Sequence, residues 1–226
     1  MQAQCSLLPA NAPADVRVWL VNIDLDAPLS DAGADVLQAG EMKRAQRFLR
    51  HQDAARFVTM RATLRRLLAA EVEADPAQLM LDADANGRPI LAMRNAPDFN
   101  VSHSGALGLI AMSRERRVGV DIEEARASFD WRELEASVLH DTDKRVIDAM
   151  PHTEPSRAFF ACWTAKEAVL KAQGEGVGGS VLTMQRFSVL PRDGVRYVLS
   201  SEVRAFEAMS LAAPYGYAAA LAWSTQ

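Results

Sequence analysis

Apolar residues recur along the chain in two different periods, and these periods predict its elements. Residues 16–26, VRVWLVNIDLD, are rich in branched and aromatic side chains and lie between turn-forming segments, which predicts a strand. From residue 41 to residue 73 the apolar positions recur at helical spacing instead. The segment RHQD, residues 50–53, interrupts that pattern, so we expect two helices, with Asp53 as the cap of the second. The positions that set the helical spacing are Phe57, Met60, Leu64, Leu67 and Leu68.

The second half of the chain offers a similar mixture of strands and helices. Residues 106–113 and 117–124 have the pattern of two strands separated by a short polar segment, which is typical of a hairpin. Residues 157–172 predict a strong helix that ends at the glycines of QGEGVGG. A stripe of small residues should let one face of this helix pack closely on a neighbour; it consists of Ala161, Ala165, Ala168 and Ala172. Further helical signals lie at 131–150, and further strand signals lie at 195–200 and 215–223.

Together these elements predict the fold class and a division of the chain. The turn signal Asn86-Gly87 leads into an extended stretch, and a plausible junction follows near Gly105. Each side of the junction contains strands and helices. We therefore expect an α+β fold with two similar-sized subdomains, residues 1–105 and 106–226.

Composition and charge narrow the classes of function. Of the 226 residues 49% are hydrophobic, enough to bury a sizeable core. The 29 acidic residues outnumber the 25 lysines and arginines, and the formal charge of -4 argues against a general nucleic-acid binder. The two cysteines, Cys5 and Cys162, cannot form a disulfide framework or a zinc cluster. No apolar run reaches about 20 residues and the N-terminal segment lacks the pattern of a secretory signal, so we expect a cytoplasmic protein without a membrane span.

Two carboxylates stand out in VGVDIEE, residues 118–124. Side chains alternate along a strand, so Asp121 and Glu123 should share one face while the branched residues point the other way. A rise of about 3.4 Å per residue puts their Cα atoms about 7 Å apart, close enough to hold one cation between them. Acids on the outer face of an amphipathic strand are ordinary, so the alternation by itself favours a solvated face.

A second charged group lies in the helix FFACWTAKEAVLKAQGEG. Glu167 and Lys171 are one turn apart on a common face, with Trp163 a turn earlier and Lys166 alongside. On a solvated helix this would be an ordinary ion pair. The aromatic residues of FFACW predict a largely buried helix instead, in which acids and lysines need partners.

Other candidates are ambiguous by themselves. His103 in NVSHSG suits either a hydrogen-bonded turn or a phosphate, because Asn100, Ser102 and Ser104 supply donors around it. The glycines of GEGVGG follow a helix and lack the lysine of a phosphate loop, so we interpret them as a helix stop. Cys162 has the features of a core residue. The arginines between residues 44 and 66 are either a solvated helix face or a site for a phosphate-bearing ligand.

In combination these motifs are much more specific. VGVDIE, followed about forty residues later by WTAKEAVLK, resembles the signature of the 4′-phosphopantetheinyl transferases, in particular the Sfp-type group that modifies carrier proteins. NGRPIL, FNVSHSG, RFLRHQDAAR and the GEG after Lys171 support the same resemblance, which covers almost the whole chain. The fold that it implies is a single-chain pseudo-dimer of two α/β subdomains with the active site in the cleft between them.

The resemblance also implies a reaction and a metal site. The enzyme would transfer 4′-phosphopantetheine from coenzyme A to a serine of a carrier protein and release adenosine 3′,5′-bisphosphate. Asp121, Glu123 and Glu167 would hold Mg²⁺, which prefers oxygen ligands and substrate phosphates. Lys171 would neutralise the pyrophosphate with Lys166 in support, and either Glu167 or a metal-bound water would take the serine proton.

For coenzyme A the resemblance implies further contacts. Ser102 and His103 would contact its phosphates. Arg56 would bind the 3′-phosphate, with Lys43 and Arg44 as the nearest matches to an upstream basic pair. Arg88 and Pro89 would lie along the adenine through their backbone. The N-terminal subdomain would thus supply the nucleotide contacts, and the C-terminal subdomain would supply the metal site and the catalytic helix.

The expected partner is an acyl or peptidyl carrier protein. The enzyme itself is expected to be a monomer. The carrier should dock between residues 125 and 160, helped by Arg126, Arg132 and Arg157 through electrostatic steering. Fatty-acid, polyketide and nonribosomal-peptide carriers all remain open, as does tolerance for acylated coenzyme A. Two alternatives belong to other classes: a binding module that holds coenzyme A or a carrier without turnover, and a different magnesium-dependent enzyme acting on a diphosphate.

Overall fold

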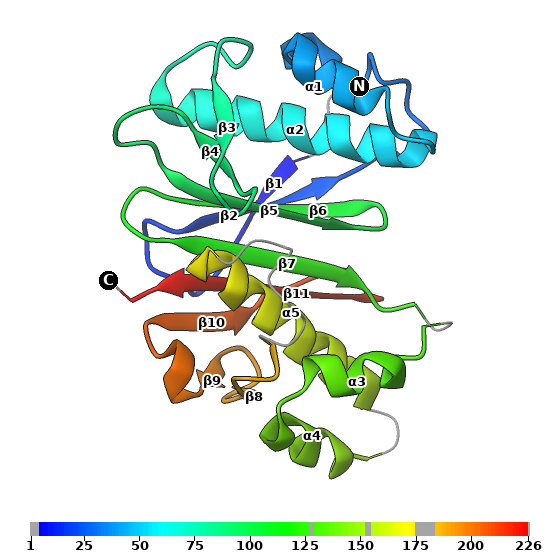
Figure 1. The fold of residues 1–226 in the computed structure, drawn as a ribbon, viewed down its shortest axis with the longest axis vertical. Coiled ribbons are helices and arrows are strands. Elements are labelled where there is room, and N and C mark those ends of the chain that lie inside the picture. Colours follow the sequence, from blue (N-terminus) through cyan, green and yellow to red (C-terminus); the bar gives the residue numbers. More distant parts are fainter. Residues whose placement is uncertain (1–4, 127–128, 152–154, 175–183, 226) are drawn as a thin grey trace.

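Two antiparallel sheets form the framework of the part of the chain that the structure describes (Figure 1). This computed structural model describes residues 5–126, 129–151, 155–174 and 184–225. The first sheet has the strand order β1-β2-β6-β5, and the second has the order β10-β11-β7. The strands of the first sheet are β1 (Cys5–Leu8), β2 (Arg17–Asn22), β5 (Asp98–Ser104) and β6 (Leu107–Ser113). Those of the second are β7 (Val118–Glu124), β10 (Phe206–Ser210) and β11 (Tyr217–Ser224).

The first sheet is covered by the helices of the N-terminal half. A short 3-10 helix (Ala34–Val36) precedes α1 (Ala39–Ala45) and α2 (His51–Val72), and Figure 1 shows α1 and α2 above the sheet. One face of α2 packs on the sheet because its apolar residues recur at helical spacing. A hairpin of β3 (Leu81–Ala83) and β4 (Pro89–Leu91) stands beside this layer. The buried residues shared by α2 and the sheet include Val21, Met60, Leu64, Leu68, Phe99 and Ile110.

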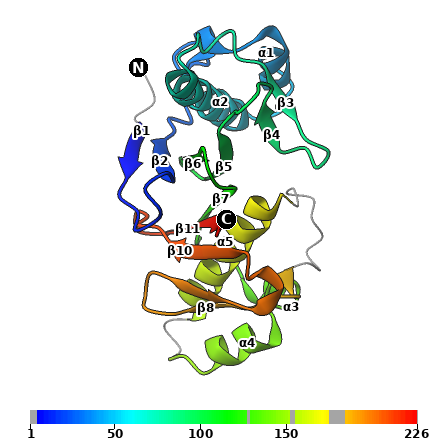
Figure 2. The same ribbon diagram turned by 90° about the vertical axis from the view of Figure 1, so that its left-hand side faces the viewer.

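The second sheet is covered by α5 (Pro155–Gln173), with α3 (Arg132–Val138) and α4 (Asp141–Asp148) farther from the first sheet (Figures 1 and 2). The small hairpin of β8 (Val189–Pro191) and β9 (Tyr197–Leu199) and a 3-10 helix (Ser201–Val203) complete this half. A common apolar core joins the two sheets, since residues of β2 and β6 cluster with residues of β7 and β11. The halves are therefore packed on each other through the faces opposite their helices.

Small residues allow α5 to approach β7 closely. Ala165, Ala168 and Ala172 are fully buried, and a Cβ atom at Gly119 of β7 would collide with the carbonyl oxygen of Ala168. The expected alanine stripe thus packs on a glycine in the neighbouring strand. The expected stop of the helix is also confirmed, because Gly174 follows α5 with a φ of 92° that favours glycine. The remaining glycines of GEGVGG lie outside the described residues.

The expected hairpin between residues 106–113 and 117–124 is wrong. Strand β6 pairs with β2 and β5, whereas β7 pairs with β11 in the other sheet. Strand β7 instead faces β5, and side chains of β5 replace a backbone ladder there. Asp98, Asn100 and Ser104 accept hydrogen bonds from the backbone N–H groups of Val118, Val120 and Glu124, at 2.7, 3.0 and 3.1 Å.

The observed boundaries of helices and strands differ from the expected ones in a few places. The break near residues 50–53 is confirmed, but Arg50 is the N-cap residue of α2, and Asp53 lies inside its first turn. Strands β1 and β10 were not anticipated from the pattern. Strand β6 belongs to the first sheet and β7 to the second. We therefore propose that the boundary between the two subdomains lies at residues 114–117 and not at Gly105. No helix in the described part of the chain is long and apolar enough to cross a membrane.

Candidate active site

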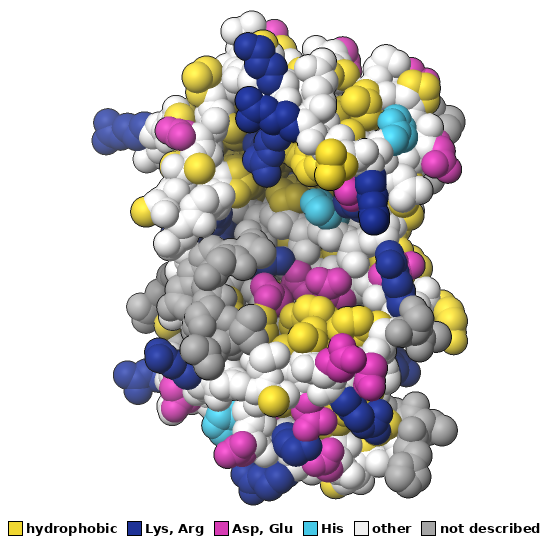
Figure 3. Space-filling view, turned by 45° about the vertical axis from the view of Figure 1, so that its right-hand side comes forward, with side chains coloured by type: hydrophobic (Ala, Val, Ile, Leu, Met, Phe, Trp, Pro, Cys, Tyr) yellow, Lys and Arg dark blue, Asp and Glu magenta, His cyan; other side chains and the backbone are white. Residues whose placement is uncertain are grey.

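A cavity of about 820 Å³ lies between the helix-covered first sheet and the β7–α5 layer. Figure 3 shows a hollow between the two halves, with acidic side chains on one wall and basic side chains on the other. Its acidic wall comes from β7 and α5, and its basic wall comes from α1 and α2. The lining residues with chemical groups are Glu41, Arg44, Arg61, Ser102, His103, Asp121, Glu123, Trp163, Glu167 and Lys171.

Asp121 is buried at the centre of the acidic wall, with 2% of its surface exposed, so it does not lie on a solvated face. Its Oδ1 atom accepts hydrogen bonds from Lys171 Nζ at 2.6 Å and from Ser102 Oγ at 2.8 Å. Its Oδ2 atom is buried without a hydrogen-bond partner among the described residues. A buried carboxylate oxygen without a partner is costly, so this atom can readily accept a cation or a donor.

Glu123 and Glu167 add two more carboxyl groups to the same wall. As the strand alternation predicts, Glu123 lines the cavity together with Asp121, and it accepts a hydrogen bond from Ser104 Oγ at 3.0 Å. Burial, and then the negative charge of Asp121, raise the pKa of Glu123 to about 7. Burial also raises the pKa of Glu167, and Asp121 adds to the shift while Lys171 opposes it. The wall thus concentrates more negative charge than Lys171 neutralises.

These acids have the right chemistry for a divalent cation, although they do not form a closed cage. Within the described residues, no group of three or more His, Cys, Asp or Glu side chains converges closely enough to hold a metal ion by itself. The unpaired Asp121 Oδ2 and the mutual repulsion of the acids nevertheless favour a cation here. Mg²⁺ commonly takes only one or two protein carboxylates and completes its shell with water and phosphate. The residues present therefore fit that ion.

Lys171 is the cation that the structure places in this wall. It is buried, and its Nζ atom donates to Asp121 and, at 3.3 Å, to Ser102 Oγ. Burial lowers the pKa of Lys171, but Asp121 and Glu167 outweigh that effect, so its pKa is raised. The ammonium group is therefore charged at neutral pH. It lines the cavity, where it can meet a ligand anion.

The expectation for Lys166 is wrong. Its side chain is fully buried and pairs with Asp143 at 2.6 Å, on the side of α5 away from the cavity. Its Nζ atom also donates to the carbonyl oxygens of Val138 and Met184, both at 2.9 Å. Lys166 and Lys171 are five residues apart and therefore lie on different faces of the helix. Lys166 joins α5 to the α3–α4 region instead of supporting a pyrophosphate.

The basic wall is built around Phe57 of α2. The guanidinium carbons of Arg44 and Arg61 lie 5.0 and 5.7 Å from the centre of its ring. Burial lowers the pKa of Arg61, and Glu41 opposes that shift from 3.5 Å away. The family resemblance predicts Arg44 at this site, whereas the sequence marks Arg61 only as one of the helix arginines. The spacing of Phe57 and Arg61, one turn apart on α2, is the signal that could have identified it.

Lys43, the other expected basic residue of α1, is exposed and does not line the cavity. Its neighbour Arg44 does, because the two side chains point about 100° apart around the helix. Glu41, two residues before Lys43, completes a capping box at the start of α1 and accepts a hydrogen bond from Arg65 Nε at 2.8 Å. These two contacts explain why an acidic residue lies beside the basic wall.

Arg56 lies in an adjoining cavity of about 390 Å³, and His103 lines both cavities. The Nε atom of Arg56 donates to the Gly105 carbonyl oxygen at 3.1 Å, and its Nη1 atom pairs with Asp53 at 2.7 Å. Burial, and then the charge of Arg56, lower the pKa of His103, so its imidazole is neutral at neutral pH. Arg56 can therefore contact a ligand group that extends into the adjoining cavity.

The backbone of the NGRP segment, residues 86–89, reaches the main cavity, but the Arg88 side chain does not. Gly87 and Pro89 line the main cavity, as a backbone contact would require. The Arg88 side chain points away into the protein and is buried, with 6% of its surface exposed. Its guanidinium pairs with Asp98 at 2.7 Å. A ligand in the cavity would therefore meet the hairpin backbone and not this guanidinium.

Models of one protein family match both halves of the chain. The model described as the 4′-phosphopantetheinyl transferase superfamily matches residues 117–222. A model described as the N-terminal part of 4′-phosphopantetheinyl transferases matches residues 30–115. The chain belongs to the 4′-phosphopantetheinyl transferase superfamily. It is therefore a 4′-phosphopantetheinyl transferase, and enzymes of this family transfer the phosphopantetheinyl group to carrier proteins.

Several 4′-phosphopantetheinyl transferases of other organisms are similar to this chain over about three quarters of its length. A Synechocystis protein named as a candidate 4′-phosphopantetheinyl transferase is 35% identical over 73% of this chain and 67% of its own length. The 4′-phosphopantetheinyl transferase HetI of Nostoc is 33% identical over 72% of this chain and 70% of its own length. A 4′-phosphopantetheinyl transferase of Bacillus subtilis is 24% identical, covering 77% of both chains.

Among the residues predicted for this transferase, the main cavity brings together Arg44, Pro89, Ser102, His103, Asp121, Glu123, Glu167 and Lys171. Arg56 lies in the adjoining cavity, and Lys43, Lys166 and the Arg88 side chain lie outside both. A third cavity of about 270 Å³ continues from Glu123 along Phe129, Phe160 and Trp163. This aromatic wall was not expected as part of the site. Its signal is the FFACW segment, in which Phe160 and Trp163 stack at 5.9 Å between ring centres.

Proposed function

We propose that this transferase moves 4′-phosphopantetheine from coenzyme A to a serine of an acyl or peptidyl carrier protein and releases adenosine 3′,5′-bisphosphate. The observation that carries the proposal is the cavity itself, with Lys171 and three acids facing Arg44 and Arg61. A ligand with several phosphates and a nucleotide needs such a site. The volume of about 820 Å³ is within the range of pockets that bury ligands of this size.

Both walls have a role in binding coenzyme A. Arg44 and Arg61 supply cations for phosphate groups, and the backbone of Gly87 and Pro89 supplies a surface for the adenine. Arg56, in the adjoining cavity, would bind the 3′-phosphate, and His103, which lines both cavities, would contact the phosphates. In this arrangement the N-terminal half binds the nucleotide. The C-terminal half, from β7 onward, acts on the diphosphate, which agrees with a pseudo-dimeric fold with the active site between its halves.

Asp121, Glu123 and Glu167 would hold Mg²⁺, with Asp121 Oδ2 as the atom that most needs a partner. When bound, this ion neutralises charge on the phosphate oxygens. Phosphoryl transfer depends mainly on positioning and charge stabilisation. The part of this chain is therefore to fix the diphosphate between the basic wall and Lys171.

The transfer step needs a base and a cation at the leaving group. The serine Oγ of the carrier attacks the phosphorus that bears the pantetheine arm and loses its proton to Glu167. The bond from that phosphorus to the bridging oxygen breaks, and its electron pair stays on the departing adenosine 3′,5′-bisphosphate. Lys171 neutralises the charge that develops there. Without a bound cation, burial raises the pKa of Glu167, whereas a cation held by this carboxylate would lower it.

The carrier would reach the cavity from the aromatic side. Phe129, Phe160 and Trp163 offer an apolar wall next to Glu123, suited to the pantetheine arm or to the carrier surface around its serine. Arg126, Arg132 and Arg157 are exposed around this region and suit an acidic carrier helix. We propose that the enzyme acts as a monomer in the cytoplasm, on a carrier of fatty-acid, polyketide or nonribosomal-peptide synthesis.

Intact mass spectrometry of purified apo carriers tests the proposal. Each carrier is incubated with the enzyme, coenzyme A and Mg²⁺, with a chelator in one arm and Glu167→Ala in another. We expect one carrier to gain one phosphopantetheine and adenosine 3′,5′-bisphosphate to appear in equal amount, with both products lost in the chelator and variant arms. Binding of coenzyme A without a mass gain on any carrier class would favour the binding module. Turnover of other diphosphates in place of coenzyme A would favour a different magnesium enzyme.

A further inference from the structure

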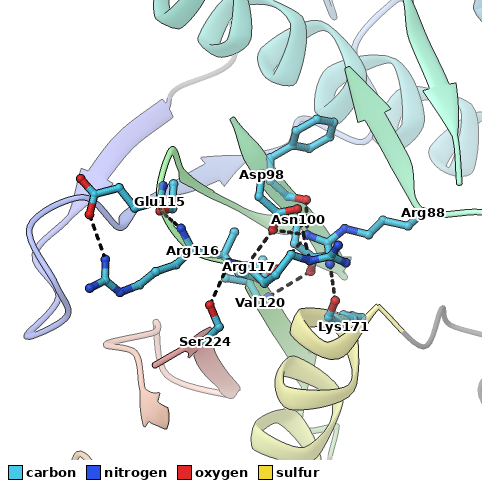
Figure 4. A network of polar contacts seen from close by, with 12 residues as sticks. Arg88, Asp98, Asn100, Glu115, Arg116, Arg117, Val120, Lys171 and Ser224 are labelled. Carbon is cyan, nitrogen blue, oxygen red and sulfur yellow. Dashed lines mark hydrogen bonds and ion pairs between the residues drawn. The ribbon is translucent and has the colours of Figure 1, made fainter. Parts of the chain in front are cut away.

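The turn between β3 and β4 contacts the end of α5, although the two lie in different halves of the chain. Arg88 Nη1 donates a hydrogen bond to the carbonyl oxygen of Lys171 (Figure 4). From the same turn, Asn86 Nδ2 donates to the carbonyl oxygen of Gly174 at 2.7 Å. Two side chains of one turn thus bind one carbonyl group in the last turn of α5 and another directly after the helix.

Such contacts stabilise a helix end for two reasons. The last four carbonyl groups of an α-helix lack partners within the helix, so external donors satisfy them. The helix dipole also places partial negative charge at this end, which favours a guanidinium cation there. Lys171 lies in the last turn of α5, where fraying is easiest. The position of its ammonium group therefore depends on what holds that turn.

Arg88 is itself held firmly. Its Nη2 atom pairs with Asp98 at 2.7 Å and donates to the carbonyl oxygens of Phe99 and Val118, at 2.7 and 2.9 Å. Only 6% of its surface is exposed. Arg88 thus connects the β3–β4 turn, strand β5, strand β7 and helix α5 through one rigid group. The same four elements carry Gly87, Ser102, Asp121 and Lys171, which line the main cavity.

We propose that Arg88 and Asn86 are positioning residues that anchor the last turn of α5 and so hold Lys171 against Asp121. The catalytic consequence rests on the proposed function, because it concerns the charge that Lys171 supplies. The anchoring itself does not. The β3–β4 turn and the C-terminal end of α5 are then fixed relative to each other by these hydrogen bonds. Their arrangement is therefore set before the ligand binds.

Hydrogen exchange on the full-length protein tests the anchoring directly. Arg88→Gln removes the guanidinium, and Asn86→Ala removes only an exposed turn side chain. We expect faster exchange at the amides of residues 170–174 in both variants, by about tenfold or more in Arg88→Gln, with residues 159–162 unchanged. Arg116→Gln is the control, since Arg116 also pairs with an aspartate, Asp15, at 2.6 Å, and its ion-pair partners among the described residues, Asp15 and Glu115, are not on α5.

Steady-state kinetics with a carrier give the second readout. We expect kcat to fall several-fold in Arg88→Gln and less in Asn86→Ala, with the KM for coenzyme A nearly unchanged, because Lys171 acts on charge that develops during transfer. Unchanged exchange at residues 170–174 in both variants, or a loss confined to KM, would overturn the proposal. If Arg88→Gln does not fold, Asn86→Ala decides. If wild type shows no transfer, the proposed function fails while the exchange data still decide the anchoring.

Discussion

Two lysines of the same helix make almost the same bond and have different roles. Lys166 and Lys171 both lie on α5, and each places its Nζ atom 2.6 Å from an aspartate oxygen. Lys166 also donates to two carbonyl oxygens, so all three of its N–H bonds are used. Lys171 has Asp121 and Ser102 as its hydrogen-bond partners in the described chain, which leaves one N–H bond for a ligand in the cavity.

The two aspartates differ in the same way. Asp143 accepts from Ser188 Oγ at 2.6 Å and from the Val189 and His140 backbone N–H groups, at 3.0 and 3.1 Å. Asp121 keeps one oxygen without a partner among the described residues. A buried ion pair whose hydrogen bonds are complete is structural, whereas an incomplete pair beside a cavity is a candidate for function. Completeness of the hydrogen bonds, and not burial or distance, separates the two pairs.

Removal of the Lys171 charge should have the largest effect on activity. Lys171→Met keeps the length of the side chain and loses the ammonium, so the developing charge on the leaving group is no longer neutralised. We expect kcat/KM to fall by about 10²–10³ or more, the usual range for loss of one such group. Quantitative mass spectrometry of the modified carrier measures this. Transfer within fivefold of wild type would show that Lys171 is not part of the reaction.

Removal of the Lys166 charge should act on stability instead. Lys166→Met leaves Asp143 buried without its cation, which should lower the free energy of unfolding by about 3–5 kcal/mol. Replacing both partners, in Lys166→Met with Asp143→Leu, should recover only part of that loss, because Ser188 and the Val189 N–H group still lose their acceptor. Denaturant titration measures both. At low temperature the folded double variant should transfer within a few-fold of wild type, and a loss of transfer as large as in Lys171→Met would refute the structural role.

The basic wall should control affinity more than turnover. Arg61→Ala removes a cation that faces the acidic wall, and we expect the KM for coenzyme A to rise about tenfold, equal to about 1.4 kcal/mol, with kcat little changed. Lys43→Ala is the matched control, because Lys43 lies on the neighbouring helix but outside the cavity. Equal effects of the two substitutions would place the phosphates elsewhere.

The smallest effect should come from the exposed arginines of the proposed carrier surface. Reversing the charges of Arg126, Arg132 and Arg157 to glutamate should raise the KM for the carrier a few-fold at low ionic strength, and added salt should reduce the difference. Arg192→Glu, an exposed arginine on the β8–β9 hairpin, serves as the control. A KM independent of both charge and salt would remove this surface from the account.

Periodicity was sufficient for much of the site. Alternation along 118–124 placed Asp121 and Glu123 on one face, and helical spacing placed Glu167 with Lys171; all four line the cavity. The same helical geometry argued against Lys166, since a residue next to Glu167 points about 100° away from it. That expectation came from the motif and not from the spacing. Motif resemblance identifies which residues recur in a family without saying which face each one occupies.

The pairing of β7 was beyond local reasoning. Strands β6 and β7 are joined by a short connection, as in a hairpin, yet they separate into different sheets. Strand pairing depends on distant residues, here β11 near the end of the chain. One local signal does indicate an unusual neighbour for β5, because polar residues occupy alternate positions of this mostly buried strand. They are Asp98, Asn100, Ser102 and Ser104. Their hydrogen bonds to β7 explain why that face is polar.

The most direct measurement replaces each aspartate by asparagine and follows carrier modification by intact mass at low temperature. Asp121→Asn and Asp143→Asn make the same small change in the two pairs. We expect Asp121→Asn to fold with near wild-type stability and to transfer almost no phosphopantetheine. We expect Asp143→Asn to be destabilised but to transfer near the wild-type rate per folded molecule. Wild-type transfer by Asp121→Asn would contradict the assignment of the active site to this cavity.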